Sequence, residues 1–306
     1  MLIPNKLKQG DKVLVVSASN SLLEKDKEYI EKSKKMLENV GLKVEFSKNS
    51  YSNTTGYGGT VVEKADDINN GFKNSEYKMI FIAKGGGNSN SLFDYLDYDV
   101  IKENPKIICG FSDSTSITNM ITEKTGLVTY SGPTFKSLSS WETDYAYKWF
   151  IKRFMEDNSD LFDIDDKSYI IKEGMAEGEL IGGNLSLISR MASGKYTLNF
   201  ENKILFIEEL GFESEPAICS GNLHYMKQNG VFDKIKGLWV GFYEHEDNIS
   251  LEKIVLEVLG ENYNFPIIKS NNFGHTDKKV IIPIGIKARI DTNKENKIEI
   301  TERCTK

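Results

Sequence analysis

The sequence predicts an α/β protein with an N-terminal parallel-sheet α/β domain and a smaller, strand-rich C-terminal domain. Three observations lead to this prediction. Short apolar strands alternate with amphipathic helices in the first half of the chain, the pattern changes after about residue 155, and a length of 306 residues suits two domains. We therefore expect an α/β domain over residues 1–160, a linker over 161–174 and a strand-rich domain over 175–306.

The first domain is predicted from its alternating strand and helix patterns. Its opening run, KVLVVSA, is apolar and β-branched, which is typical of a buried strand, and the segments between such runs place apolar residues at helical spacing. The expected strands are 12–18, 42–47, 78–83 and 106–110, and the expected helices are 24–39 and 61–75. Because strands and helices alternate with short loops, the strands are expected to form a parallel sheet flanked by helices.

The second half of the chain has a different composition and a different pattern of apolar runs. Residues 156–174 are acidic, polar and irregular, which suits a crossing between domains, and glycine-rich turns and shorter apolar runs follow. The expected strands are 203–207, 237–243 and 279–284, the expected helices lie near 216–229 and 250–260, and the sequence ARID-TNKEN-KIEI predicts a terminal hairpin.

Composition excludes several classes of protein. The chain is 39% hydrophobic and 27% charged, as in a globular protein, and its net charge of −6 argues against a nucleic-acid polymer as partner. Its longest apolar runs are about seven residues, whereas a membrane span needs about 20. The N-terminal sequence MLIPNKLKQGDKV lacks the apolar stretch of a signal peptide, so we expect a cytoplasmic protein with no membrane partner.

Cysteine usage argues against two further classes. The three cysteines, Cys109, Cys219 and Cys304, form no CxxC pair, which argues against a disulfide framework and against a cysteine-rich zinc site. No cofactor and no metal are predicted.

A serine lies where a predicted strand gives way to a helix, in the sequence KIICGFSDSTSITNMI. Ser112 at such a turn is lifted clear of the sheet, and the first N–H groups of the helix point into the same space, where they can hold an oxyanion. The alternative is that Ser112 or Ser114 only caps the helix, because serine is a favoured N-cap residue. The motif is not a full G-x-S-x-G elbow, since Ser114 stands in place of the second glycine.

A glycine loop, KGGGNSNS at residues 84–91, follows directly on the predicted strand KMIFIA. Glycines allow backbone N–H groups to approach a ligand closely. One interpretation is a phosphate cradle, although GxGxxG and GxxxxGK[ST] are both absent. The other is one half of an oxyanion hole, because consecutive strand ends of a doubly wound sheet can meet at one crevice. Asn88 is also expected to cap a helix over 89–96.

Carboxylates end the predicted strand KILFIEE. At least one of Glu208 and Glu209 should lie at the strand end, and a solvated acidic turn is the alternative. Among the three histidines, His275 is the best candidate for a base, because it follows Gly274 in a loop and histidine exchanges protons near neutral pH.

The other two histidines are weaker candidates for a base. His245 lies in EHED, which reads as a solvated acidic run, and His224 lies in a predicted helix. A His/Glu/Asp metal site is a further alternative, but no HExxH or paired-histidine spacing supports it.

Taken in order, these motifs resemble the LD-carboxypeptidase family of serine peptidases, which includes muramoyltetrapeptide carboxypeptidases and microcin C self-immunity peptidases. The resemblance covers about residues 10–300. It rests on KGGGNSNSLFDYLDYDVIKENPKIICGFSDST, TGLVTYSGP, GELIGGNLSLI, KILFIEE, GVFDKIKGLWVG and FGHTDKKVIIPIGIKARID.

The resemblance implies a serine carboxypeptidase with a Ser-Glu-His triad. By position, Ser112 would be the nucleophile, His275 the general base and Glu208 the carboxylate that orients the imidazole. The oxyanion hole would use the backbone N–H groups of Asp113 and Gly86. Substrate-binding residues are expected at Gly85, Gly87, Asn88 and Asn184, and family members are commonly homodimers.

The resemblance leaves two branches of substrate open. The first is the L,D-peptide bond of a muropeptide, cleaved in peptidoglycan recycling, and the alternative is an aspartyl amide of a nucleotide, cleaved by the immunity-type enzymes. The glycine loop is closer to the immunity type, whereas the short region 156–177 has no tryptophan, unlike that type. Trp141 and Trp149 lie upstream, at a spacing that suits packing on one helix face.

Recognition of the substrate's terminal carboxylate and two other activities also remain open. Candidates for binding a free carboxylate are Lys84, Arg190 and the asparagines at 88, 90 and 184. The competing functions are a small-molecule sensor without turnover and a metal-dependent amidohydrolase.

Overall fold

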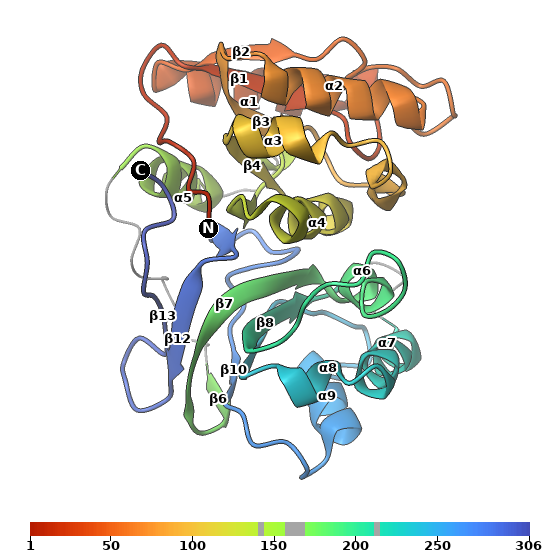
Figure 1. Cartoon of the computed structure of the whole chain (residues 1–306), viewed down its shortest axis with the longest axis vertical. Coiled ribbons are helices and arrows are strands. Elements are labelled where there is room, and N and C mark those ends of the chain that lie inside the picture. The colour runs from red at the N-terminus through yellow and green to blue at the C-terminus, as the bar shows by residue number, and fades with distance from the viewer. Residues whose placement is uncertain (140–143, 157–168, 211–214) are drawn as a thin grey trace. The chain divides into compact units, whose positions relative to one another are not determined.

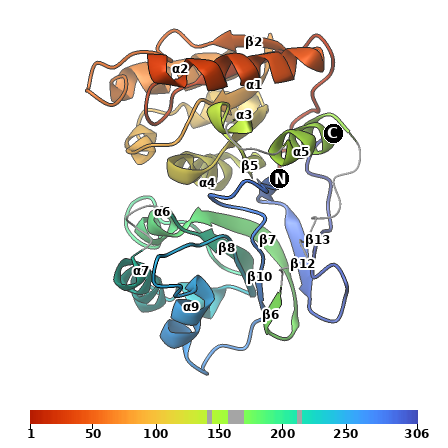
Figure 2. The ribbon, with the colours of Figure 1, turned by 180° about the vertical axis from the view of Figure 1, so that it is seen from behind.

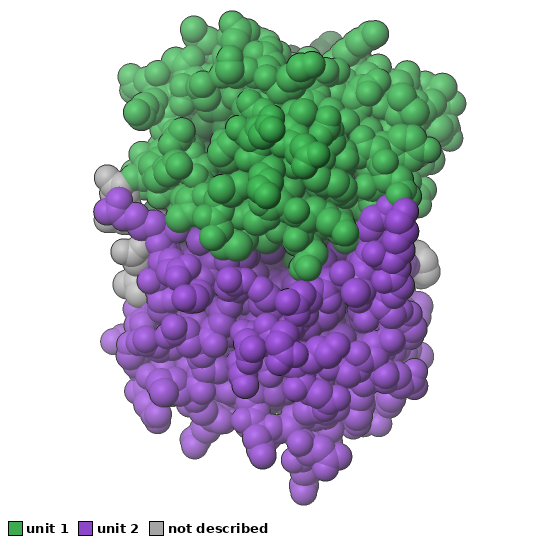
Figure 3. Space-filling view, viewed as in Figure 1, with its two compact units in different colours: residues 1–159, 281–283, 304–306 green, residues 160–280, 284–303 purple. Residues whose placement is uncertain are grey.

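The structure is a computed structural model that describes residues 1–139, 144–156, 169–210 and 215–306. The chain forms two units, shown in two colours in Figure 3. Unit 1 consists of residues 1–159, 281–283 and 304–306, and unit 2 consists of residues 160–280 and 284–303. Two short C-terminal segments therefore belong to the N-terminal unit.

Unit 1 is built on a six-stranded sheet in the order β11-β5-β4-β3-β1-β2 (Figure 1). The strands are β1 (Lys12–Val16), β2 (Lys43–Phe46), β3 (Tyr77–Ile82), β4 (Ile107–Gly110), β5 (Thr129–Ser131) and β11 (Ile282–Ile284). The pairs β1–β2, β1–β3, β3–β4 and β4–β5 are all parallel. The apolar runs of β1 and β3 are fully buried, because helices cover a parallel sheet on both faces.

The helices of unit 1 lie on the two faces of this sheet. Helices α2, α3 and α4 are in front in Figure 1, and α1 and α5 are in front in Figure 2. Their bounds are α1 (Lys27–Asn39), α2 (Val61–Lys73), α3 (Tyr98–Glu103), α4 (Thr115–Thr125) and α5 (Tyr145–Phe154). Four 3-10 turns are η1 (Glu24–Asp26), η2 (Ser89–Leu92), η3 (Ser112–Ser114) and η4 (Lys136–Leu138). The predicted parallel sheet flanked by helices is confirmed.

Unit 2 contains a mixed seven-stranded sheet in the order β13-β12-β7-β8-β9-β10-β6. Its strands are β6 (Tyr169–Lys172), β7 (Met175–Asn184), β8 (Lys203–Glu208), β9 (Gly237–Val240), β10 (Ile267–Lys269), β12 (Lys287–Asp291) and β13 (Ile298–Ile300). Its helices are α6 (Leu185–Arg190), α7 (Pro216–Gln228), α8 (Val231–Lys234) and α9 (Leu251–Leu259). The strand-rich second domain is confirmed, including the terminal hairpin, in which β12 and β13 pair antiparallel.

The central strands of unit 2 end side by side. Strands β7 and β8 are parallel, and their last paired residues are Asn184 and Glu208. Strand β7 was not predicted, because its sequence MAEGELIGGN has no simple apolar pattern. Its glycine at 182 allows a close approach: a Cβ there would lie 1.9 Å from the carbonyl oxygen of Phe206.

Two expectations differ from the structure at the level of elements. The strand expected over 279–284 is β11, which joins the sheet of unit 1. Residues 169–172, expected to be linker, form β6, which pairs antiparallel with β10. The rest of that linker up to residue 168 lies outside the described residues, as does Trp141, whereas Trp149 is buried in α5.

No helix in the described part of the chain is both long enough and apolar enough to cross a membrane.

Candidate functional site

Ser112 lies at a sharp turn between β4 and α4. Its φ is +60°, in the left-handed region that non-glycine residues rarely adopt. Such conformations cost about 1–3 kcal/mol and concentrate at active sites. The strand, the strained serine and the following helix together form the geometry that exposes a nucleophile at the end of a sheet strand.

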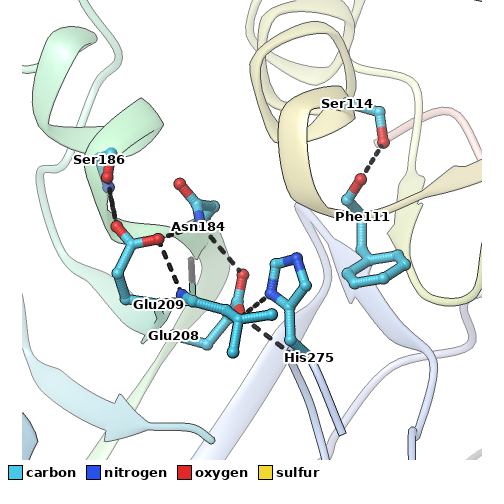
Figure 4. Close-up of polar contacts among 8 residues, drawn as sticks. Phe111, Ser114, Asn184, Ser186, Glu208, Glu209 and His275 are labelled. Atoms are coloured by element: carbon cyan, nitrogen blue, oxygen red, sulfur yellow. Dashed lines mark hydrogen bonds and ion pairs between the residues drawn. The ribbon is translucent and has the colours of Figure 1, made fainter. Parts of the chain in front are cut away.

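The flanking residues explain how the chain makes this turn. A Cβ at Gly110 would lie 2.5 Å from the Oγ of Ser114, so only glycine fits there. The Oγ of Ser114 donates a hydrogen bond of 2.8 Å to the carbonyl oxygen of Phe111 (Figure 4). Ser114 stands at the N-cap position of α4 without a side-chain capping bond, so the alternative in which Ser114 caps this helix is wrong.

Asp113 holds three segments of unit 1 together. Its carboxylate, only 5% exposed, accepts a hydrogen bond of 2.5 Å from the Oγ of Ser19 and one of 2.9 Å from the backbone N–H of Ser89. The Oγ of Ser89 donates to the carbonyl oxygen of Asp113 at 2.5 Å. The end of β1 and the residues after the glycine loop are thereby fixed against the serine turn.

The glycine loop lies against Ser112. A Cβ at Gly85 would lie 3.1 Å from the Oγ of Ser112 and 4.0 Å from the backbone nitrogen of Asp113. Gly86 has a φ of +145°, and a Cβ there would lie 2.2 Å from the side chain of Asn20. The backbone N–H of Gly87 donates to the Oδ1 of Asn20 at 3.2 Å. Glycine is therefore required at Gly86, where the loop touches Asn20, and there is little room for a side chain at Gly85 beside Ser112.

The expected helix cap at Asn88 is wrong. Asn88 has a φ of +70° and its side chain makes no capping hydrogen bond. Only a short 3-10 turn, η2, follows it, in place of the helix expected over 89–96. A left-handed asparagine is a turn residue, and this one redirects the chain after the glycines.

A buried ion pair anchors the start of the glycine loop. Asp26 is 1% exposed, and its carboxylate contacts the Nζ of Lys84 at 2.8 Å and the Nζ of Lys136 at 2.7 Å. Burial by itself raises the pKa of Asp26, but hydrogen bonds from Lys136, Lys84 and the backbone N–H of Leu23 outweigh it and lower the pKa to about 2. Lys84 is therefore already paired, which weakens it as a candidate for binding a substrate carboxylate.

In unit 2, Glu208 and His275 form a carboxylate–imidazole pair. The Oε2 of Glu208 lies 2.7 Å from the Nδ1 of His275 and accepts the backbone N–H of the same residue at 3.2 Å (Figure 4). Gly274 makes this possible, because its φ is +95° and a Cβ there would lie 2.7 Å from Glu208. The contact leaves Nε2 as the ring nitrogen for proton exchange.

The Glu208 carboxylate is charged in this environment. It is 2% exposed, so burial by itself raises its pKa. The charge and hydrogen bond of His275, followed by the charge of Lys279 and a hydrogen bond from Asn184, outweigh burial and lower the pKa. The alternative of a solvated acidic turn is therefore wrong.

Glu209, next in the chain, is also buried, with no exposed surface. Its Oε1 accepts a hydrogen bond of 2.5 Å from the Nδ2 of Asn184, which also lies 3.5 Å from the Oε1 of Glu208. Burial raises the pKa of Glu209, and the neighbouring charge of Glu208 raises it further, against the hydrogen bond from Ser186. Two adjacent carboxylates thus lie in the same buried network.

The other two histidines lie elsewhere in unit 2. His224 lies on helix α7, as predicted, and it is exposed there, not packed. The expectation that His245 is solvated is wrong, because its side chain is only 7% exposed and lies 3.5 Å from Glu215 and 3.7 Å from Asp247. Among the described residues, no group of three or more His, Cys, Asp or Glu side chains is placed to hold a metal ion.

The predicted site residues therefore form two local clusters. Within unit 1 the structure brings Ser112 and Asp113 together with the glycine loop, and within unit 2 it brings Glu208, His275 and Asn184 together. Sequence reasoning missed Ser19 and Asn20, and it named Glu209 only as a strand-end carboxylate without a role of its own. The polar run SASNS directly after the first strand was a signal for the first two, because strand ends carry ligand-facing residues in such sheets.

Comparison with known proteins identifies the same family in both halves of the chain. Residues 13–132 match the model of the LD-carboxypeptidase N-terminal domain, and residues 177–290 match that of the C-terminal domain. YocD of Bacillus subtilis strain 168, named as a carboxypeptidase, is 31% identical over 94% of this chain and 95% of its own. A second protein of that strain, named as a murein peptide carboxypeptidase, is 29% identical over 94% of this chain and 91% of its own.

A relative of known structure carries a different name. The microcin C7 self-immunity protein MccF of Escherichia coli is 31% identical over 80% of this chain and 80% of its own. The solved structure of MccF in complex with aspartyl sulfamoyl adenosine matches with a TM-score of 0.90 and 27% identity, covering 100% of both chains.

Proposed function

Because the chain belongs to the LD-carboxypeptidase family, and is accordingly a serine-type carboxypeptidase hydrolase, we propose that its catalytic triad consists of Ser112, His275 and Glu208. In this proposal unit 1 contributes the nucleophile and unit 2 contributes the base and its carboxylate. The observation that carries the assignment is the left-handed backbone of Ser112 at the end of β4, since strained non-glycine residues concentrate at active sites.

The chemistry follows from the environments of these residues. A serine hydroxyl is a weak nucleophile and needs a hydrogen-bonded base. The Nε2 of His275 takes the proton of Ser112 as Oγ attacks the carbonyl carbon, and it then gives that proton to the leaving amine. Glu208 fixes the ring through Nδ1 and stabilises the imidazolium. Water then hydrolyses the acyl-enzyme by the same proton transfers.

The oxyanion is assigned to backbone N–H groups. The N–H groups of Asp113 and Gly86 stabilise the negative charge that develops on the carbonyl oxygen. Gly85 lies beside Ser112 and the backbone nitrogen of Asp113, which supports this assignment. Gly87 and Asn88, in the same loop, and Asn184 are proposed to bind the substrate. Losing one such donor typically costs about 10²–10³-fold in rate.

We propose an L,D-peptide bond of a muropeptide as the substrate, so that the reaction releases a terminal D-amino acid in peptidoglycan recycling. The relative named as a murein peptide carboxypeptidase supports this proposal, since the match spans nearly the whole chain. The second candidate is an aminoacyl (aspartyl) nucleotide amide. It is favoured by the MccF structure with aspartyl sulfamoyl adenosine, which matches over the whole chain.

A side-by-side turnover assay with mass detection tests both candidates. One substrate is a muropeptide tetrapeptide ending in D-alanine, and the other is aspartyl sulfamoyl adenosine. Release of D-alanine by the wild type and not by Ser112→Ala supports the first proposal, and cleavage of only the nucleotide analogue supports the second. Turnover that survives in Ser112→Ala contradicts the triad itself.

A further inference from the structure

Glu209 is a buried ionisable group of unit 2 that the proposed reaction does not use. Its side chain has no exposed surface, and the carboxylate receives four N–H or O–H groups. These donors are the Nδ2 of Asn184, the backbone N–H and the Oγ of Ser186, and the backbone N–H of Leu210, which follows Glu209 in the chain and donates at 3.0 Å. Every partner is a donor, so the carboxylate acts only as an acceptor.

The contacts of Glu209 fix which way the Asn184 amide points. The Nδ2 of Asn184 lies 2.5 Å from Glu209 and 3.5 Å from Glu208, so the amide nitrogen faces both carboxylates. The Oδ1 of Asn184 points away from them (Figure 4). The reverse orientation would place the amide oxygen of Asn184 against two carboxylate oxygens. This orientation is disfavoured, because all of these oxygens are acceptors and the hydrogen bond to Glu209 would be lost.

The Glu208 carboxylate is in turn held at both of its oxygens. Oε2 accepts from His275, and Oε1 faces the Nδ2 of Asn184. The contact with Asn184 is long at 3.5 Å, so it depends on the amide being kept in place from its other side. Glu209 provides that support.

We propose that Glu209 is a positioning residue of this enzyme, which orients Asn184 and through it the Glu208 carboxylate that holds His275. The inference rests on the proposed function, because Glu208 and His275 are placed in the reaction there.

The alternative is that Glu209 only anchors the start of α6, since Ser186 lies in the first turn of that helix. The two roles differ in what Asn184 does. An anchor of α6 acts independently of the Asn184 side chain, whereas a positioning residue acts through it. A double-mutant cycle separates them, because coupled residues give non-additive effects.

The experiment compares Glu209→Gln, Asn184→Ala and the double variant on whichever substrate the wild type hydrolyses. We expect Glu209→Gln to lower kcat by about tenfold or more with KM changed by less than about threefold. In the Asn184→Ala background the same substitution should change kcat by less than about twofold. Glu252→Gln is the matched control, because it neutralises another carboxylate of unit 2, 13% exposed and 3.6 Å from Lys269, and should leave kcat unchanged.

A second readout needs no substrate. The proton in the contact between the Nδ1 of His275 and Glu208 is followed by NMR as a downfield resonance. We expect it to shift in Glu209→Gln and in Asn184→Ala, with no further shift in the double variant, and to stay in place in Glu252→Gln. If Glu209→Gln does not fold, Glu209→Asp serves instead, because it keeps the charge but withdraws it from Asn184 by one methylene.

Independent effects of the two substitutions on kcat, or an unmoved resonance in the Glu209 variant, would overturn the proposal. Failure of the wild type to cleave either substrate would count against the proposed function alone, and the NMR cycle would still decide the role of Glu209.

Discussion

Asp26→Asn is expected to destabilise unit 1 by about 2 kcal/mol at pH 7. Asp26 is buried between Lys84 and Lys136, and these contacts lower its pKa from 3.8 to about 2. One pH unit of difference corresponds to about 1.36 kcal/mol, so ionisation of the folded state contributes about 2 kcal/mol to stability. Removing the charge also leaves two lysines without their common partner, which adds to the loss.

The sign of the pH dependence follows from the lowered pKa. The stabilisation is complete above pH 3.8 and is lost as the pH falls toward 2. About half of it remains at pH 3 and little at pH 2. The difference in stability between the wild type and Asp26→Asn should therefore be constant from pH 7 to pH 5 and should shrink below pH 4.

Denaturant unfolding at pH 7, 5 and 3 measures this difference, with tryptophan fluorescence and circular dichroism as separate probes because the chain has two units. Glu28→Gln is the matched control, since Glu28 is exposed on α1 and should have little effect. A difference that stays the same from pH 7 to pH 3, or one below about 0.5 kcal/mol at pH 7, would refute the electrostatic reasoning.

Three further predictions concern the backbone and the proposed triad. Ser112→Gly should abolish turnover yet stabilise unit 1 by about 1 kcal/mol in thermal unfolding, because glycine tolerates a φ of +60°, and a lower melting temperature would contradict the strain. Glu208→Gln should lower kcat by about 10⁴-fold with the fold intact by circular dichroism, because an amide no longer fixes the imidazole tautomer; near wild-type turnover would exclude its role. Gly182→Ala should destabilise unit 2 by about 3 kcal/mol or more, because its Cβ would lie 1.9 Å from the carbonyl oxygen of Phe206, whereas Gly221→Ala, with open space around it, should not; equal melting temperatures would contradict this.

The local sequence was sufficient to predict a strand or helix wherever the apolar pattern of the segment itself decides its structure. The apolar runs at β1, β3 and β4 and the amphipathic helices α1 and α2 form as predicted, because burial on both faces of a parallel sheet demands such runs. The resemblance to a family placed a serine, a glutamate and a histidine, and the contact between Glu208 and His275 agrees with the roles assigned to them.

Where the pattern was ambiguous, partners distant in sequence made the decision. Strand β7 is rich in glycine and polar residues, and it becomes a central strand only because β8 packs closely against Gly182. Residues 169–172 read as linker, but pairing with β10 makes them a strand.

The sequence by itself thus predicted most strands and helices of unit 1 and the α/β and strand-rich halves of the chain, and the family resemblance supplied the candidate site residues. The tertiary structure alone decided which polar side chains are buried and which partners they have. Glu209 reads as a solvated residue in the sequence but is buried among donors from β7 and α6, and Asn88 reads as a cap but adopts a left-handed turn. The physical reason is that the cost of burying a charge and the partners that offset it are set by contacts between segments far apart in the chain.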